Sequence, residues 1–371
     1  MLSACPSGLA LTPRTLRGRR VTGIHQLLSA AAPHDATTEQ ALIWRRLLRE
    51  WGYESEIVAE SVHPELMGSV RMLDRGGRRL VRSGGVVLHY TIWSSAAEAA
   101  LGTREQFGLC YHNITPGDLL REFNPSLAAL CDRGRDALPD FRGRVSALIA
   151  DSSFNAADLR EAGLGDATVV PLGFELPPEV PRRDPSPEPV VLSVGRIVPN
   201  KRLEDVIKAF ALYQRRHAPR ASLVLVGPYQ GFESYRQALD LLVFRARARR
   251  VFFTGQISLA ARDAWYRRAD VYLSMSVHEG FCVPLIESLA HGVPVVANDA
   301  GAMPETLGGA GLVVDGSDLA LVAEALHELT SSRSTRDVLA DAADVRLAEL
   351  QPEALAPRIR SALSPLLDGR A

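Results

Sequence analysis

The segment HEGFCVPLIESLAHGVPVV runs from His278 to Val296 and decides the fold class of this chain. A short apolar run, VYLSM, precedes it, and VPVVA at its own end has the composition of a buried parallel strand. Pro284 suits the first turn of a helix between these two strands. The predicted unit is therefore strand, loop, helix, strand. Its loop lies at the carboxyl end of the first strand, where open α/β sheets bind their ligands.

Two carboxylates, Glu279 and Glu287, stand eight positions apart in this segment. The free N–H groups of a helix that starts near Pro284 suit a phosphate. Glu279 in the loop and Glu287 one turn inside the helix can accept hydrogen bonds from sugar hydroxyls. Because an unpaired buried carboxylate is costly, Glu287 on this apolar helix must face a crevice or find a partner in the core. Glu279 could also be a solvent-facing loop acid. These parts favour binding of a nucleotide-sugar.

Composition narrows the class of protein. A length of 371 residues suits two domains of about 150–200 residues each. The net charge of −1 argues against a general nucleic-acid binder, which usually has a basic excess. No apolar run approaches the roughly 20 residues of a membrane span. The four cysteines have no metal-ligand or disulfide spacing, which favours a reducing cytoplasm. They are Cys5, Cys110, Cys131 and Cys282.

Alternating strand-like and helical patterns continue from about Val21 to the end, which predicts parallel sheets with helices on both faces. The segment ELPPEVPRRDPSPEP is dense in proline and charge, as interdomain linkers are. The first twenty residues contain four arginines but no continuous apolar core, so we expect a disordered leader rather than a secretory signal. The expected divisions are a leader at 1–20, a doubly wound domain at 21–175, a linker at 176–189, a second doubly wound domain at 190–350, and a helix at 351–371 that packs back on the first domain.

The expected elements follow from the same patterns. In the first half, the strands are Val21–Leu28, Glu54–Ala59, Gly85–Tyr90, Phe107–His112, Val145–Ala150 and Thr168–Leu172. The helices there are Thr38–Trp51, Pro116–Ala137 and Asn155–Glu161. In the second half, we expect a strand at Ser222–Gly227 and helices near Leu203–Arg216 and Pro352–Leu367.

A second motif, GRIVPNK, places Gly195, Arg196 and Lys201 just beyond a predicted strand. Two cations there could clamp a diphosphate while the glycine lets the backbone approach it. Surface Arg and Lys are usually only solvated, so the motif is informative because of its position. Together with the two glutamates and the segments VLSVGRIVPNKRLEDVIKAF, LVLVGP and FTGQIS, it resembles the retaining glycosyltransferases of family 4. These have the GT-B fold, in which two Rossmann-like domains face each other across a cleft.

The resemblance implies roles for individual residues of the second half. Arg196 and Lys201 would bind the donor diphosphate, Glu287 the ribose hydroxyls, and Glu279 the transferred sugar. The other donor-binding residues implied are Gly195, Gly280, Phe281, Cys282, Val283 and, at the base, Gln256 and Ile257. Arg202 stands where many relatives carry glycine, which we expect to alter the start of the following helix.

In the first half, LCYHNITP places His112 at the end of a strand, where the family keeps a cleft histidine. It would contact the donor sugar or stabilise charge, so the implied catalytic set is His112, Glu279, Arg196 and Lys201. Asn113 and Thr115 could reach phosphate or acceptor, and we expect His89 on the same rim. A histidine at a strand end is often only hydrogen-bonded scaffold. Asp151 is expected to cap the helix that follows it.

The implied activity is transfer of a glycosyl group from a nucleotide-diphosphate sugar to an acceptor hydroxyl with retention, in assembly of bacterial surface polysaccharide or natural-product glycans. No Asp-x-Asp element occurs, so we expect no metal and no cofactor besides the donor. The acceptor would be a glycan, a lipid-linked sugar or a small molecule.

Two alternatives stay open: a nucleotide-sugar epimerase of the same architecture, and a catalytically silent subunit that binds the donor. We expect a cytoplasmic protein. The arginine-rich run Arg245–Arg250 is of a kind that is usually only solvated, and its more specific interpretation is a weak contact with the inner membrane face.

Overall fold

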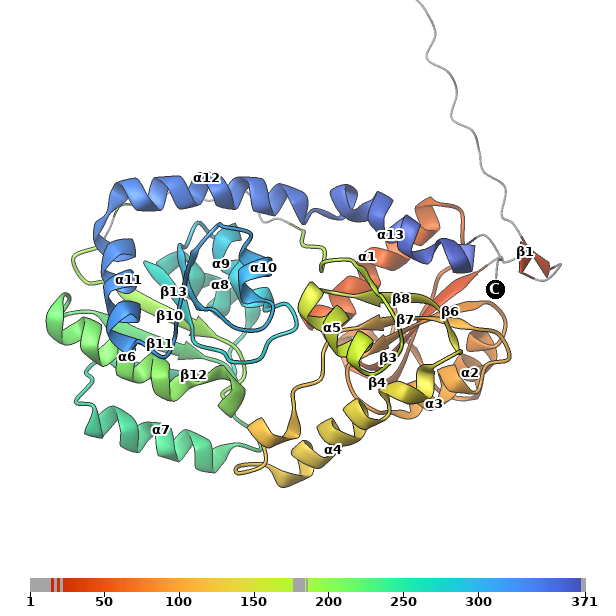
Figure 1. Cartoon of the computed structure of the whole chain (residues 1–371), viewed down its shortest axis with the longest axis horizontal. Helices are drawn as coiled ribbons and strands as arrows, with labels where there is room; N and C mark the ends of the chain where they lie inside the picture. Colours follow the sequence, from red (N-terminus) through yellow and green to blue (C-terminus); the bar gives the residue numbers. More distant parts are fainter. Residues whose placement is uncertain (1–14, 17–18, 21–22, 176–183, 185, 368–371) are drawn as a thin grey trace, which may run out of the picture.

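The computed structural model describes residues 15–16, 19–20, 23–175, 184 and 186–367. Two lobes lie end to end, each built on a parallel sheet (Figure 1). The N-terminal sheet has seven strands and the C-terminal sheet six. The predicted class, two doubly wound α/β domains, is confirmed.

The N-terminal sheet has the order β5-β4-β3-β6-β7-β8-β9, and all its pairings are parallel. Its strands are β3 (Ile24–Ala31), β4 (Ile57–Val62), β5 (Arg71–Met72), β6 (Gly85–Tyr90), β7 (Phe107–Tyr111), β8 (Val145–Ala150) and β9 (Thr168–Val169). Because the chain order reverses beside β3, the carboxyl ends of β3, β6, β7 and β8 share the edge where side chains can face a ligand.

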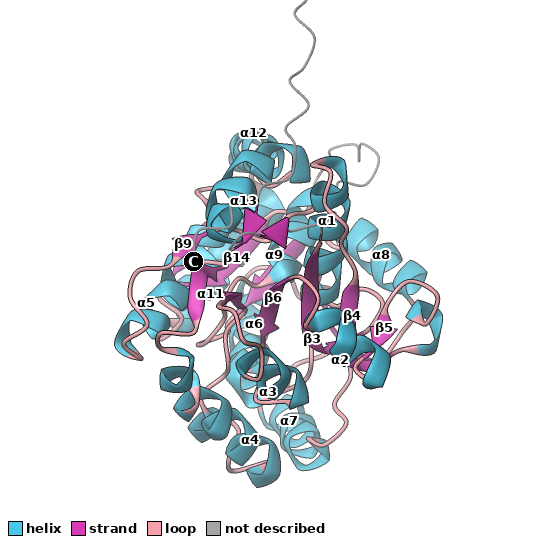
Figure 2. Ribbon diagram, turned by 90° about the vertical axis from the view of Figure 1, so that its right-hand side faces the viewer, coloured by secondary structure: helices cyan, strands magenta, loops and turns pink. Residues whose placement is uncertain are grey.

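Helices lie on both faces of this sheet, as the view along the long axis shows (Figure 2). They are α1 (Ala36–Glu50), α2 (Arg75–Val81), α3 (Ser95–Leu101), α4 (Pro125–Asp136) and α5 (Ser153–Glu161). Short 3-10 turns occur at η1 (Pro64–Leu66), η2 (Gly117–Leu119) and η3 (Leu138–Phe141). Asp35 caps α1 by accepting from the backbone N of Thr38 at 3.0 Å, as its position before an apolar helix leads one to expect.

The single helix expected over Pro116–Ala137 is wrong. The structure has the turn η2 and then α4, which begins only at Pro125. Pro125 disfavours a helical backbone at the residue before it, and Asn124 is accordingly non-helical, with φ −148° and ψ 80°. The Asn124 side chain caps α4 by accepting from the N–H of Leu127 at 2.9 Å.

The C-terminal sheet has the order β12-β11-β10-β13-β14-β15, again all parallel. Its strands are β10 (Val190–Val194), β11 (Ser222–Val226), β12 (Val251–Gly255), β13 (Val271–Ser274), β14 (Val295–Asn298) and β15 (Leu312–Val314). The turn η4 (Pro199–Lys201) precedes α6 (Leu203–Arg216), followed by α7 (Glu233–Arg245), α8 (Leu259–Arg268), α9 (Val283–Ala290), α10 (Met303–Leu307) and α11 (Leu319–Ser331). The order of chain segments reverses between β10 and β13, so this sheet also has a switch point at its carboxyl edge.

The last two helices run back along the molecule (Figure 1). α12 (Arg333–Glu349) packs against α9 of the C-terminal lobe, and α13 (Pro352–Leu367) packs against β8 and α1 of the N-terminal lobe. Leu355, Ile359 and Leu363 of α13 are buried in one cluster with Trp44 of α1. The chain therefore crosses between the lobes a second time near Leu350.

Most of the expected leader and most of the expected linker fall outside the described residues. Within the leader, Thr15–Leu16 (β1) and Arg19–Arg20 (β2) pair as a short antiparallel ladder. Among the described helices, none is both long enough and apolar enough to cross a bilayer.

Candidate functional site

The loop after β10 is shaped by two glycines at neighbouring strand ends. Gly195 has φ +145°, and Gly227 at the end of β11 has the same φ. A Cβ on Gly227 would lie 2.0 Å from the carbonyl oxygen of Gly195, so only glycine fits there. The loop carrying Arg196 can therefore lie directly over the end of β11, beside a small pocket that Lys201 also lines.

Lys201 and Glu279 form a preformed ion pair at this pocket. The ammonium of Lys201 donates to Glu279 Oε1, and the two side chains are 20% and 11% exposed. Burial lowers the pKa of Lys201, but the Glu279 carboxylate outweighs it, and the Lys201 pKa is raised above its usual value. Two residues that stand 78 positions apart in sequence are thus brought together as the resemblance implied.

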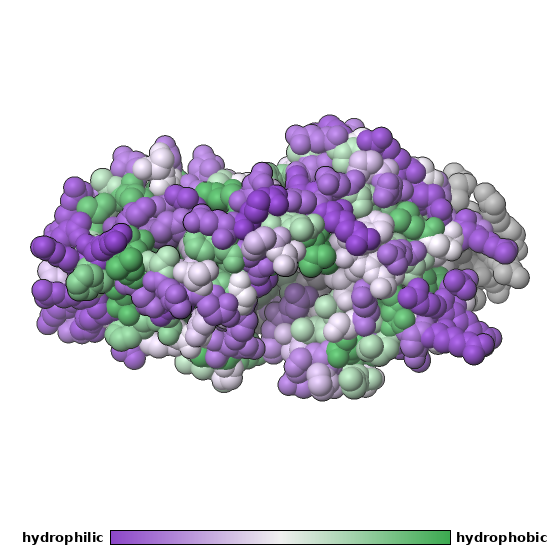
Figure 3. Space-filling model, turned by 90° about the horizontal axis from the view of Figure 1, so that it is seen from below, coloured by the Kyte–Doolittle hydropathy of each residue, from purple (hydrophilic) through white to green (hydrophobic). Residues whose placement is uncertain are grey.

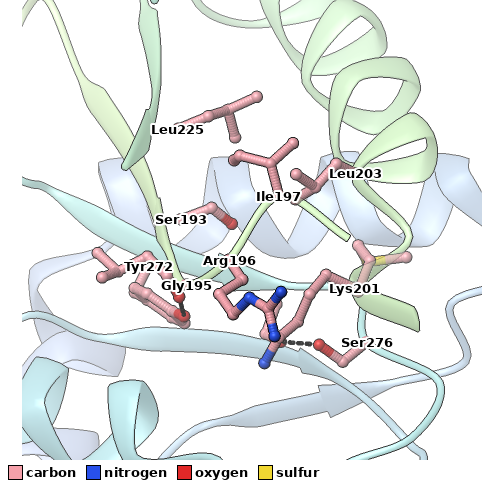
Figure 4. Close-up of a pocket in the computed structure, with 12 residues that line it drawn as sticks. Ser193, Gly195, Arg196, Ile197, Lys201, Leu203, Leu225, Tyr272 and Ser276 are labelled. Atoms are coloured by element: carbon pink, nitrogen blue, oxygen red, sulfur yellow. Dashed lines mark hydrogen bonds between the residues drawn. The ribbon is translucent and has the colours of Figure 1, made fainter. Parts of the chain in front are cut away.

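Arg196 differs from Lys201 in having no carboxylate partner among the described residues. Its guanidinium lies 5.9 Å from the centre of the Phe232 ring. In the close-up, the side chains of Arg196 and Lys201 extend from the same loop into the same space (Figure 4). A guanidinium offers five N–H donors and suits a diphosphate, so Arg196 is the cation here that remains available to an anion.

The loop of the HEGF motif turns directly into α9. Cys282 precedes the helix in a left-handed conformation, with φ +71°, and Pro284 stands in its first turn, as expected. Phe281 and Cys282 are buried, whereas Gly280 and Val283 are half-buried. Burial raises the pKa of the Cys282 thiol well above its usual value, so it stays protonated. This turn therefore offers its backbone, rather than the thiol, to a ligand.

Glu287 already has two protein partners from α8. Its Oε2 accepts from the hydroxyl of Tyr266 at 2.8 Å, and its Oε1 pairs with Arg262 at 2.9 Å. Of the two possibilities that the sequence left open for Glu287, a partner in the core is therefore present. Glu287 is nevertheless one of the charges acting on Tyr272, as is Glu279, and Tyr272 lines the pocket with Arg196. The ribose role of Glu287 stays a prediction.

Gln256 and Ile257 follow β12 at the carboxyl edge of the same sheet. Gln256 is exposed and Ile257 is half-buried against the core that also contains Phe281. They stand two strands away from β10, so a base contact would extend the site along the sheet edge. That contact stays a prediction.

The N-terminal lobe touches the HEGF loop through Asn113. Asn113 has φ +75°, and its Oδ1 lies 2.7 Å from Nε2 of His278. A Cβ on Gly280 would lie 2.5 Å from Cβ of Asn113, so glycine is required for this approach. Ser152 Oγ also donates to the carbonyl oxygen of Gly280 at 2.7 Å. Seen from below, a hollow separates the two lobes (Figure 3). Thr115, on the same segment, is half-buried.

His112 is enclosed by other side chains. Its Nδ1 lies 2.8 Å from Asp151 Oδ2, its Nε2 lies 2.8 Å from Nδ1 of His89, and its side chain is 4% exposed. Both ring nitrogens are thus hydrogen-bonded within the protein, and neither is free to contact a sugar. Its neighbour Asn113 is the residue that reaches the other lobe.

Two expectations about this region are wrong. His89 is 1% exposed and lies inside β6, between Gln26 and His112, so it is not on the rim. Asp151 does not cap α5, because the cap is Ser152, whose Oγ accepts from the N–H of Asn155 at 3.2 Å. Sequence reasoning missed Gln26, although a signal for it exists: Gln26 is a polar side chain in a mostly apolar strand, IHQLLSAA, and needs a partner there. Nothing in the sequence pairs Asp151 with His112.

Among the described residues, His89, Cys110 and His112 have their nitrogen and sulfur atoms within 4.8 Å of one another, close enough to hold a metal ion. The two imidazole nitrogens already lie at hydrogen-bond distance, however, and the described cysteines are all free thiols. Hydrogen bonding accounts for this group of side chains without an ion.

Comparison with known proteins gives a family match over most of the C-terminal lobe. The model of one family, Glycosyl transferases group 1, matches residues 180–346. Over these residues, which are less than half of the chain, the protein is similar to that family. The match includes both motifs that decide the site, GRIVPNK and HEGF, and therefore Arg196, Lys201, Glu279 and Glu287.

Curated relatives of this family match mainly over a part of their length. The O-antigen chain mannosyltransferase B of Escherichia coli is 29% identical over 40% of this chain. A GDP-mannose-dependent alpha-(1-6)-phosphatidylinositol monomannoside mannosyltransferase of Mycolicibacterium smegmatis is 36% identical over 38% of this chain. A D-inositol 3-phosphate glycosyltransferase of Pseudarthrobacter chlorophenolicus is 32% identical over 54%. The alignments cover 38%, 38% and 51% of these proteins, so the chain spans about half of their length or less.

Solved structures of glycosyltransferases share the fold over nearly the whole chain. Anabaena HepE in complex with UDP and glucose has a TM-score of 0.71 and 18% identity, covering 93% of this chain and 100% of that one. Sucrose-phosphate synthase from Thermosynechococcus elongatus has a TM-score of 0.70 and 20% identity, covering 93% and 99%. At this identity they show the two-lobed GT-B architecture alone.

Proposed function

We propose that this protein transfers a sugar from a nucleoside-diphosphate donor to an acceptor hydroxyl, with retention at the anomeric carbon. One observation carries the proposal: an unpaired guanidinium, Arg196, stands beside the Lys201–Glu279 pair at the carboxyl ends of the strands. The same HEGF loop that holds Glu279 is touched by Asn113 of the opposite lobe. A diphosphate bound to the cations would thus present its sugar to the gap between the lobes.

The chemistry follows from where charge develops. As the bond between the anomeric carbon and the diphosphate breaks, negative charge grows on the leaving oxygen. Arg196, Lys201 and the free N–H groups at the start of α9 place positive potential there, which lowers the barrier. The acceptor oxygen forms the new bond on the same face of the sugar, and its proton passes to a leaving phosphate oxygen. Glu279 is held by Lys201, which suits a binding role for its carboxylate.

Donor identity is open to a direct test. GDP-mannose is the first candidate, because the names of several curated relatives specify it. UDP-glucose is the second, because it is the ligand named with a structural neighbour. The experiment incubates the protein with each donor and a panel of acceptors and follows nucleoside diphosphate release, with NMR of the product to read the anomeric configuration. We expect release that depends on an acceptor, and an anomeric configuration equal to that of the donor.

Arg196→Gln supplies the matched test of the site. Loss of one preorganised donor to developing charge costs about 100-fold in kcat, and we expect a loss of that size. Arg333→Gln is the control, because Arg333 is an exposed arginine on α12 that pairs with Asp184, away from this pocket. Equal turnover in the two variants would contradict the proposal.

The two alternatives give different products. An epimerase would convert the donor without an acceptor, so incubation with donor alone separates it from a transferase. A silent subunit would bind a donor and produce nothing with any acceptor. The retained Arg196, Lys201 and Glu279 favour an enzyme over the silent subunit.

We further propose that the enzyme assembles a surface glycan on the inner membrane face. The Escherichia coli relative is named for an O-antigen chain, which is a glycan. Phe244 at the end of α7 is 80% exposed, and arginines 245, 247 and 249 follow it closely in the sequence. This edge suits an anionic bilayer.

Cosedimentation with vesicles tests the membrane contact. We expect binding to vesicles with anionic lipid, loss with neutral lipid or high salt, and weakening in Phe244→Ser. Val338→Ser serves as the control, because Val338 is 67% exposed on α12. Binding that is equal for neutral and anionic vesicles would overturn this assignment.

A further inference from the structure

A row of buried polar side chains crosses the centre of the N-terminal sheet. It joins β3, β6 and β7 to the end of β8 through Gln26, His89, His112 and Asp151. The contacts are Gln26 Oε1 to His89 Nε2 at 2.9 Å, His89 Nδ1 to His112 Nε2 at 2.8 Å, and His112 Nδ1 to Asp151 Oδ2 at 2.8 Å. Gln26, His89 and Asp151 are at most 2% exposed. Polar groups this deep persist only where each contact has a donor and an acceptor.

The first link fixes the direction of the row. The amide nitrogen of Gln26 donates to the carbonyl oxygen of Ala41 at 2.7 Å, so the amide oxygen faces His89. An amide oxygen only accepts, and therefore His89 carries its proton on Nε2. Burial, and then the charge of His112, hold the pKa of His89 well below its ordinary value. His89 is consequently neutral, and its Nδ1 is an acceptor.

The remaining links settle His112. Because Nδ1 of His89 accepts, Nε2 of His112 must donate. Nδ1 of His112 faces a carboxylate oxygen, so a proton also lies between these two atoms. Burial lowers the pKa of His112, but the Asp151 carboxylate outweighs burial and raises it well above its ordinary value. Burial also raises the pKa of Asp151, and the positive ring of His112 opposes that rise. Both His112 nitrogens thus carry protons.

We propose that Gln26, His89 and Asp151 are positioning residues that hold His112 as an imidazolium with both N–H groups directed into the protein. The cation is next in sequence to Asn113, which contacts His278, the neighbour of Glu279 on the donor loop. It is a fixed positive charge on the acceptor side of the gap. This role rests on the proposed function: the His112 cation stabilises the leaving diphosphate from the lobe opposite Arg196.

Among the described residues, few charged or titratable groups act on His112. They are Asp151 from the end of β8, His89 from β6 and Cys110 from β7 itself. Burial raises the pKa of Cys110, so the thiol stays neutral. Asp151 is therefore the one anion in this set, and its removal should release the proton of His112.

NMR of histidine-labelled protein tests the protonation state without any assay of activity. At about pH 8, above the ~6.5 of a free imidazole, we expect two one-bond N–H correlations from His112, assigned by their loss in His112→Asn. Asp151→Asn keeps the shape and an acceptor but removes the charge, so one correlation should remain. His89→Gln can still donate to Gln26 and accept from His112, so both should persist.

The pH profile adds a functional test. The pKa of His112 is higher in the folded protein than in the unfolded chain. His112 is therefore fully protonated below its unfolded-state pKa, and it loses the proton as the pH rises through its folded-state pKa. Wild-type kcat/KM should therefore stay level through about pH 8. If Asp151→Asn returns the His112 pKa to about 6.5, only about 3% of the ring is protonated at pH 8, which predicts a loss of about thirtyfold. Activity should recover as pH falls to about 6.

Several outcomes would overturn the proposal. A bare ring nitrogen on His112 in the wild-type protein at about pH 8 contradicts it directly. So does an unchanged His112 pKa in Asp151→Asn. Stoichiometric zinc in the purified protein, lost in both His89→Gln and Cys110→Ala, would make the group a metal site instead. If the NMR result holds while no donor supports transfer, the proposed function fails and the proton arrangement stands.

Discussion

Lys201 and Glu279 show how a single contact can serve stability and function together. Removing one partner of a mostly buried ion pair leaves the other charge unpaired, at a cost of about 3 kcal/mol. We expect Lys201→Met to lower the free energy of unfolding by about that amount. Lys201→Met with Glu279→Gln should recover most of it, because no lone charge remains. Both variants should lose about 100-fold in kcat, because the cation is gone in each. Urea unfolding and donor turnover measure the two effects, and normal turnover in the double variant would exclude the assigned role of Lys201.

At the scale of elements, Arg202 controls how η4 passes into α6. Its φ of 50° and ψ of 45° are left-handed, a conformation that costs a non-glycine residue about 1 kcal/mol. Its guanidinium pairs with Asp205 at 2.6 Å and with Glu204 at 3.2 Å. Both Arg202→Gly and Arg202→Ala remove these pairs, but only glycine relieves the backbone. We expect Arg202→Gly to be more stable than Arg202→Ala by about 1 kcal/mol in urea unfolding. Equal stability would show that the left-handed turn carries no strain.

The elements that the sequence predicted best are those with continuous apolar patterns. β6, β8, α6 and α13 have the predicted boundaries, because buried strands and amphipathic helices are visible in the order of their residues. The donor motifs could be predicted equally well, because each lies within one strand-loop-helix unit. The sequence does not predict the row from Gln26 to Asp151, since the row depends on the register of four neighbouring strands, β3, β6, β7 and β8. The helix start after Asn124 could have been predicted, because an Asn-Pro pair marks the start of a helix. The sequence analysis missed it.

At the scale of the whole molecule, the contacts across the gap decide how far the lobes open. The chain crosses between the lobes near the linker and near Leu350, and Glu305 of α10 adds a side-chain contact to Ser153 of α5. Its carboxylate accepts from the backbone N–H of Ser153, at 2.8 Å and 3.1 Å, and from the Ser153 hydroxyl at 3.1 Å. Charge-assisted hydrogen bonds of this kind contribute about 1.5 kcal/mol, which is about tenfold in the ratio of open to closed forms. Glu305→Ala should therefore increase the radius of gyration in small-angle scattering and raise KM for the donor. Glu324→Ala removes a carboxylate that pairs with Arg216 and His217 within the C-terminal lobe, so it should change neither. If the two variants scatter alike, Ser153 and Glu305 are not what holds the lobes together.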